Sequence, residues 1–111
     1  MQSKGKLYVL VNKDLKMSIG KTAAQVAHAV ARLNIAHPHT VIVLEGNSWQ
    51  LQNLNTYLSE IKIHSLYIDE GANEVLPMSA TALAFGLYEL DEVPDYVAGF
   101  KLLKKKVWWK I

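Results

Sequence analysis

Four polar side chains near the N-terminus recur at a spacing that would gather them on one side of a helix. At about 100° per residue, Gln25, His28 and Arg32 lie within about 60° of one another, and Lys21 opens the same stretch. Lys21 would stand in the first turn, where unpaired backbone N–H groups already carry partial positive charge. An ammonium, an amide, an imidazole and a guanidinium without a carboxylate therefore indicate an anion site, such as one for phosphate. The alternative is a solvated helix face that tolerates a lysine at an unfavourable position.

The elements that must position these residues alternate between strands and helices. Apolar runs rich in β-formers predict four strands, at residues 6–12, 40–45, 63–69 and 80–88. Capping residues and apolar spacing predict three helices: one from residues 18–20 to Pro38, one after residues 46–48, and a short one over residues 91–98.

This order predicts an α/β fold, a single-domain three-layer sandwich with a four-stranded mixed sheet and helices on both faces. The link of about ten residues before the fourth strand is too short for a crossover helix, so that strand should be antiparallel to a neighbour. Function in such sheets gathers at the carboxyl ends of the parallel strands. We therefore expect residues 12–20, Lys21, Gln25 and Asp69 near one edge.

The same pattern predicts which helix faces are buried. In the first helix the face toward the sheet should hold small and branched residues: Ala23, Ala24, Val26, Ala27, Val30, Ala31 and Leu33. In the second helix the inner side should hold Trp49, Leu51, Leu54, Leu58 and Ile61.

Composition narrows the class of protein. The chain has 111 residues and half of them are apolar, which fits one globular domain. It has no cysteine, its four histidines show no metal-ligand spacing, and no stretch approaches the ~20 apolar residues of a membrane span. We therefore expect a cytoplasmic protein with no metal and no membrane span.

Charge is distributed unevenly along the chain. Residues 1–37 carry six basic side chains and one acidic one, residues 101–111 carry five lysines and no acid, and nine acids lie between. Two basic ends would favour a polyanion partner if they meet in space. The alternative is that the charges simply solvate separate surfaces.

The first helix start lies within a longer motif, Asp14-Leu15-x-Met17-x-x-Gly20-Lys21-x-Ala23-Ala24-Gln25-x-x-His28-Ala29. This motif resembles, residue for residue, the opening signature of the type-2 (archaeal and eukaryotic) peptidyl-tRNA hydrolase family. Residues 69–81 are similar to that family's D-A-G-x-T-Q-I-x-P-G-S-x-T segment, and residues 91–103 resemble its closing segment. The likeness spans residues 6–103, so we divide the chain into a hydrolase-like domain (1–103) and a basic aromatic tail (104–111).

The resemblance implies a cofactor-free esterase that cleaves the bond between a peptide and the 3′ end of tRNA. Carried over, the catalytic residues are Lys21, Gln25 and Asp69. Lys21 would hold phosphate or ribose and stabilise the oxyanion, Asp69 would position or deprotonate a water, and Gln25 would hold the ribose or carbonyl. The predicted substrate-binding residues are Lys13, Asp14, Gly20, His28, Arg32 and Asn73, although His28 also fits a structural partner on the same face.

Four positions depart from the family pattern: Asn12 replaces an Arg, Asn73 a Thr, Glu74 a Gln and Met78 a Gly. The alternative function is therefore a non-catalytic small binding protein of the same fold, with its loop chemistry lost at Asn73 and Glu74. A third possibility is a structural dimer built through the tail. Trp108 and Trp109 suit nucleic-acid stacking or a membrane surface, but we expect them to pack, including in a homodimer contact.

Overall fold

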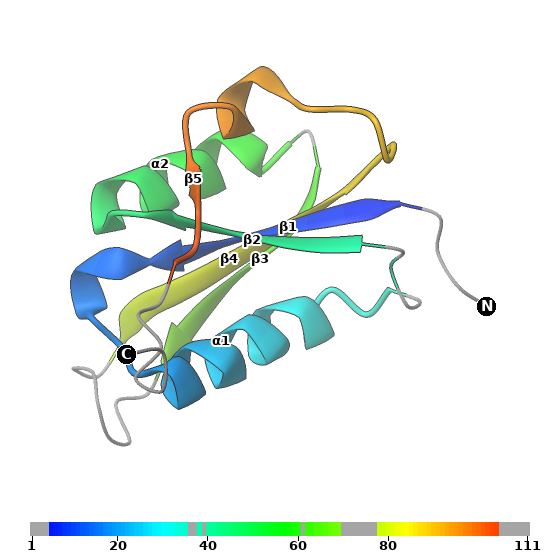
Figure 1. Ribbon diagram of the computed structural model, residues 1–111. Coiled ribbons are helices and arrows are strands. Elements are labelled where there is room, and N and C mark those ends of the chain that lie inside the picture. Colours follow the sequence, from blue (N-terminus) through cyan, green and yellow to red (C-terminus); the bar gives the residue numbers. More distant parts are fainter. Residues whose placement is uncertain (1–4, 36–37, 39, 61, 70–77, 105–111) are drawn as a thin grey trace, which may run out of the picture.

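The computed structural model describes residues 5–35, 38, 40–60, 62–69 and 78–104 (Figure 1). The strands are β1 (Lys6–Asn12), β2 (Thr40–Gly46), β3 (Ile63–Asp69), β4 (Ser79–Tyr88) and β5 (Lys101–Leu102). The helices are α1 (Ile19–Ala31) and α2 (Ser48–Leu58), and two short 3-10 turns are η1 (Lys13–Leu15) and η2 (Asp95–Val97).

The five strands form one mixed sheet in the order β3-β4-β1-β2-β5. Strand β1 is parallel to β2 and antiparallel to β4, and β4 is also antiparallel to β3. The predicted α/β class and mixed sheet are confirmed, but the predicted number of four strands is wrong. The fifth strand, β5, has only two residues and is antiparallel to β2. A strand of two residues is too short to show an alternating apolar pattern in the sequence. It forms because it pairs with the neighbouring strand β2.

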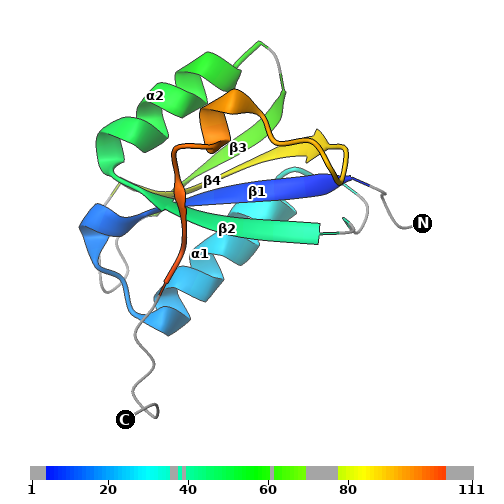
Figure 2. The ribbon, with the colours of Figure 1, turned by 45° about the horizontal axis from the view of Figure 1, so that its top comes forward.

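The third predicted helix, over residues 91–98, is also wrong. Only the short turn η2 forms within this segment. The residue before η2 is Pro94, which is extended, so Asp91 does not cap η2. The remainder of the segment runs as a connection that carries the chain past α2 to β5 (Figure 2).

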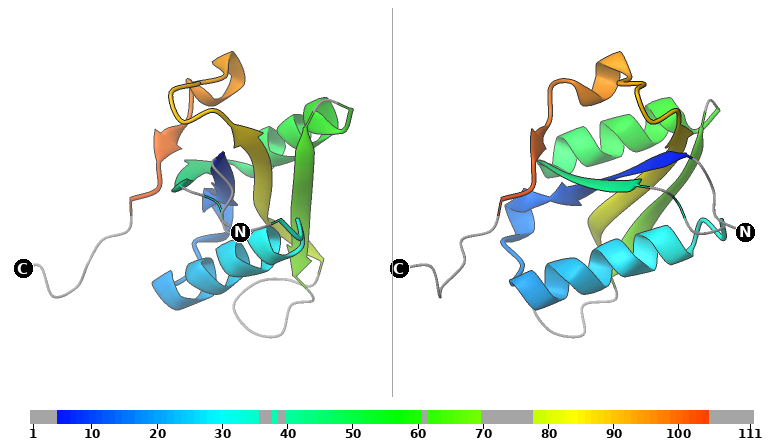
Figure 3. Two further views of the ribbon diagram at one scale, coloured as in Figure 1. Left: turned by 90° about the vertical axis from the view of Figure 1, so that its right-hand side faces the viewer. Right: turned by 45° about the vertical axis from the view of Figure 1, so that its right-hand side comes forward.

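The sheet is covered by α2 on one face and by α1 on the other (Figure 3). Strand β1 is buried along its whole length, and its alternating side chains feed two cores. Tyr8 and Leu10 join the core under α2, whereas Val9 and Val11 join the core over α1. The described helices include none long and apolar enough to cross a membrane.

Both helices differ from the predicted orientation at particular residues. Helix α1 buries Thr22, Gln25 and Ala29, while Ala23, Ala24, Ala27 and Ala31 are exposed; Val26, Val30 and Leu33 do pack on the core. Helix α2 buries Leu51, Leu54 and Leu58 as predicted, but Trp49 is 72% exposed. Side chains two residues apart on a helix point about 200° away from each other, so Trp49 lies opposite Leu51. Ile61 lies outside the described residues.

Asn12 fixes the edge of the sheet at which β1 ends. Its buried Nδ2 donates to Ser48 Oγ at 2.8 Å and to the Ala80 carbonyl at 2.9 Å, and its Oδ1 accepts from the Asp14 amide. The start of α2 and the start of β4 are thereby tied to the end of β1. Strands β1, β2 and β3 all end at this edge, as the parallel arrangement requires.

Met78, one of the departures from the family pattern, has a left-handed backbone with φ of 65° and an amide that donates to the Asp69 carbonyl at 2.7 Å. Such a conformation costs a residue with a Cβ on the order of 1–3 kcal/mol, and the side chain recovers little because it is 72% exposed. Met78→Gly removes this strain, but glycine also has greater entropy in the unfolded chain, which cancels part of the gain. We expect the free energy of unfolding to rise by about 0.5–1 kcal/mol. Urea denaturation measures this, with Met78→Ala as control; equal stability of the Gly and Ala variants would contradict it.

Candidate functional site

Lys21 and Asp69 form an ion pair at the carboxyl edge of the sheet. Lys21 Nζ lies 3.0 Å from Asp69 Oδ1, and the side chains are only 9% and 8% exposed. Ser18 caps α1 and accepts from the Lys21 amide at 3.1 Å, so Lys21 occupies the first turn as predicted. Asp69 is the last residue of β3. The structure therefore joins two residues predicted from motifs 48 positions apart.

This pair changes the anion-site prediction. The anion beside the Lys21 ammonium and the N-terminal turn of α1 is the Asp69 carboxylate of the same chain. A carboxylate at this place offsets both the lysine charge and the partial charge of the helix end. Removing two charges from water is costly, and close pairing is what compensates for it. Chemically, a carboxylate next to an ammonium can orient a water and stabilise negative charge developing on a bound carbonyl.

Gln25, the third predicted catalytic residue, is not on a solvated face. It is 2% exposed, and its Oε1 accepts a hydrogen bond of 2.7 Å from the Thr81 hydroxyl. Thr81 is fully buried in β4 and also lies 3.3 Å from the Tyr67 carbonyl. An amide can face the sheet because this partner satisfies it. Thr22, also buried in α1, has a hydroxyl without a hydrogen-bond partner among the described residues.

His28 and Arg32 both contact the ring of Tyr67. The His28 ring stacks on Tyr67 at 4.7 Å between centroids and 15° between planes, and the Arg32 guanidinium lies 5.8 Å from the same ring. These contacts hold α1 against β3, which agrees with the structural interpretation of His28. Sequence reasoning missed Tyr67, and its only signal is that it precedes Asp69 by two positions and so shares its face of the strand.

Three predicted substrate-binding residues lie on the loop or helix start at this edge. Lys13 is exposed in η1. Asp14 is also exposed, but its Oδ2 accepts from the Ser48 amide at 2.9 Å, next to the Asn47 cap of α2. Gly20 precedes Lys21, and a Cβ added there would meet no atom within 4 Å, so the surface is open. Asn73 and Glu74 lie outside the described residues.

Among the residues that the structure describes, no cluster of three histidine, aspartate or glutamate side chains is placed to hold an ion. The described groups with chemical potential at this edge are the Lys21–Asp69 pair, the nearby helix start and the buried amide of Gln25.

Residues 5–39 match a protein family described as "Peptidyl-tRNA hydrolase PTH2". No curated protein matches the chain. The family resemblance is confirmed for this stretch, which contains β1, η1 and α1. Lys21 and Gln25 lie within the match, and Asp69 lies beyond it.

Removing either member of the ion pair should destabilise the protein, because the other charge stays nearly buried. We expect Lys21→Met and Asp69→Asn to be coupled by about 0.5–3 kcal/mol, so that the double variant loses less stability than the two single losses combined. Urea denaturation of all four proteins gives this coupling energy. Lys16→Met, an exposed lysine of the preceding loop, is the control and should change little. Additive losses would show that the pair contributes no coupling energy.

Gly20→Ala should be tolerated by the fold. Because α1 is already formed there and a Cβ meets open space, we expect a gain of about 0.5 kcal/mol from the lower unfolded-state entropy of alanine. Thermal unfolding measures the change. A loss of stability would mean that Gly20 has a backbone role, whereas weaker binding of an N-blocked aminoacyl-tRNA with stability retained would identify it as a substrate contact.

Proposed function

We propose that this protein hydrolyses the ester bond between a peptide, or an N-blocked amino acid, and the 3′ end of tRNA, without a cofactor. The observation that carries the proposal is the 3.0 Å contact between Lys21 and Asp69. Lys21 comes from the stretch that matches the hydrolase family, and the fold brings a carboxylate to it from a motif that also resembles that family. Acid–base chemistry on an ester needs such a positioned pair.

In the proposed reaction Asp69 accepts a proton from a water molecule, and the resulting hydroxide attacks the ester carbonyl carbon. Lys21 and the start of α1 stabilise the oxyanion that forms. The bond between the carbonyl carbon and the ribose oxygen then breaks, and the ribose oxygen takes the proton from Asp69. The peptide leaves as a carboxylic acid, which releases its proton to solvent and becomes a carboxylate.

Gln25 and the neighbouring residues have supporting parts in this proposal. Since Gln25 is nearly buried against Thr81, we assign it to positioning the first turns of α1 on β4. Lys13 and the open surface at Gly20 are proposed to receive the tRNA 3′ end. The activity would be cytoplasmic, where tRNA is, and the homodimer through Trp108 and Trp109 stays a prediction because both residues lie outside the described part.

A non-catalytic binding protein of the same fold is the second candidate. The observation that favours it is the low exposure of the pair, since Lys21 and Asp69 satisfy each other and are 9% and 8% exposed. Substitution of the loop threonine by Asn73 and of the glutamine by Glu74 points the same way.

Release of the blocked amino acid from an N-blocked aminoacyl-tRNA separates the two candidates. We expect turnover by the wild type and a loss of at least about 100-fold in kcat/KM for Lys21→Ala and Asp69→Asn, with Lys16→Ala unchanged. Circular dichroism shows whether each variant is folded. Wild-type rates in both variants would exclude the pair as the site.

No turnover by folded wild type would favour the binding protein. In that case, turnover gained by Asn73→Thr combined with Glu74→Gln would show that catalysis was lost at the loop.

A further inference from the structure

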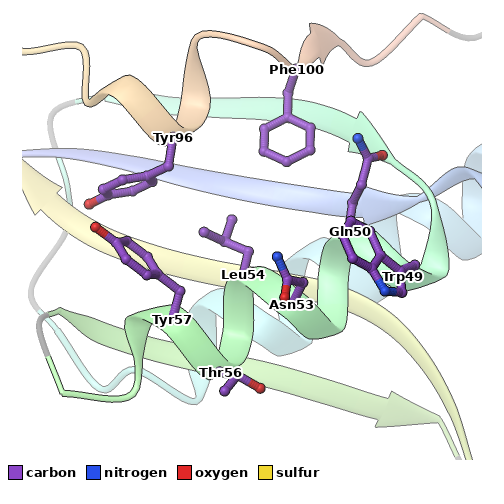
Figure 4. Close-up of a pocket in the computed structure, with 8 residues that line it drawn as sticks. All are labelled: Trp49, Gln50, Asn53, Leu54, Thr56, Tyr57, Tyr96 and Phe100. Atoms are coloured by element: carbon purple, nitrogen blue, oxygen red, sulfur yellow. The ribbon is translucent and has the colours of Figure 1, made fainter.

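A groove lies on the α2 side of the sheet, away from the face that α1 covers. Helix α2 forms one wall and the chain between η2 and β5 forms the other (Figure 4). Its volume is about 580 Å³, which is within the roughly 300–1,000 Å³ typical of ligand sites. Its principal lining residues are Trp49, Gln50, Asn53, Tyr57, Tyr96 and Phe100.

Aromatic rings dominate both walls. The rings of Tyr57 and Tyr96 meet edge to face at 5.3 Å, and Phe100 faces α2 from the opposite wall (Figure 4). Trp49 stands at the far end and is 72% exposed. Tyr57 is also exposed, whereas Tyr96 and Phe100 are half-buried against the core. A patch of large rings that reaches the surface usually marks a binding site, and flat ring faces suit a planar ligand.

Amide groups accompany these rings. Figure 4 shows the Asn53 amide directed into the groove beside Leu54. Gln50 is held by the helix cap, since its Oε1 accepts from the Asn47 amide at 2.9 Å. Side-chain amides both donate and accept, which is what the hydrogen-bonding edge of a nucleobase requires.

The groove continues into a basic hollow. This smaller space, of about 100 Å³, shares Gln50 and Phe100 with the groove and is also lined by Lys13 and Lys101. Glu45, the cross-strand neighbour of Lys101, is the acidic residue of this lining, so two lysines and one glutamate line the hollow. Lys13 directly follows β1 at the same edge of the sheet as the Lys21–Asp69 pair.

We propose that the groove binds unpaired nucleotides of an RNA strand, with bases stacked on Trp49 and Phe100 and phosphates at Lys13 and Lys101. Stacking rings next to a cationic channel form the recognised means of holding a single strand. An apolar protein segment would use the rings but would not use the positive charge by which Lys13 and Lys101 exceed Glu45 in the adjoining hollow. The inference rests on the proposed function in one respect: the RNA in the groove would be the part of the tRNA that lies beside the scissile ester.

Binding of a fluorescein-labelled single-stranded RNA of eight nucleotides, followed by anisotropy, tests the groove directly. Loss of one base stack should weaken binding roughly 5- to 100-fold in Trp49→Ala. The matched control is Ile63→Ala, which removes an exposed apolar side chain of the edge strand β3. Lys13→Ala and Lys101→Ala should each reduce the slope of log affinity against log salt by about 0.7.

Equal affinity of Trp49→Ala and wild type would overturn the proposal, as would equal binding of an abasic strand of the same length. Absence of RNA binding together with binding of an apolar peptide in the groove would also overturn it and assign the surface to a protein partner. Trp49 is exposed, so its removal should leave the fold intact, which circular dichroism checks.

Kinetics separate this inference from the proposed hydrolysis. Trp49→Ala should raise KM for N-blocked aminoacyl-tRNA while leaving that for N-blocked aminoacyl-adenosine unchanged, since the nucleoside does not reach the groove. Trp49-dependent RNA binding without hydrolysis would reject the activity and retain the groove. Hydrolysis for which neither RNA binding nor KM changes in Trp49→Ala would retain the activity and reject the groove.

Discussion

The buried amide of Asn12 is the interaction on which the functional edge of the sheet depends. A polar group this deeply buried is stable only when it is fully hydrogen-bonded, and Asn12 achieves this with partners from three other segments. Those partners are Ser48 at the start of α2, Ala80 in β4 and Asp14 in η1. The same few bonds therefore tie the first residue of α2 and the loop after β1 to the end of β1, while the capping box of Asn47 and Gln50 sets where α2 begins. This position is one at which the chain departs from the family it resembles, and the departure has a structural explanation of its own.

The arrangement of strands explains why Lys21 meets Asp69. Strand β4 lies between β3 and β1 and is antiparallel to both, so β3 and β1 end at the same edge although they do not touch. The chain leaving β1 turns through η1 and enters α1 at that edge. A lysine in the first turn of a helix is disfavoured by the helix dipole, and a carboxylate ending a nearby strand removes that penalty. The ion pair is thus a consequence of topology together with one unfavourable helix position.

The sequence allowed prediction of the mixed sheet and of the meeting between Lys21 and Asp69, because these follow from strand order and motif position. It did not allow prediction of the orientation of Gln25, which depends on a hydrogen bond to Thr81 across 56 residues. A helical pattern alone treats an amide as solvent-facing. Trp49 differs for another reason: its apolar character favours the inner side of α2, whereas its angular position, opposite the buried Leu51, places it in solvent. The pairing of β5 with β2 depends on tertiary contact alone.

The structure also brings together one lysine from each of the two basic ends of the chain. Strand β5 brings Lys101 beside β2, whose other neighbour is β1, and Lys13 follows directly at the end of β1. Lys13 and Lys101 consequently line one hollow although they are far apart in sequence. At this edge Asp14 is engaged by the α2 amide and Asp69 by Lys21, so neither carboxylate is left to balance the exposed lysines by a direct bond of its own. Lys13 and Lys101 outnumber Glu45 in the lining of this hollow, and the resulting positive charge attracts a polyanion. The aromatic groove that opens beside it favours a polyanion with exposed bases.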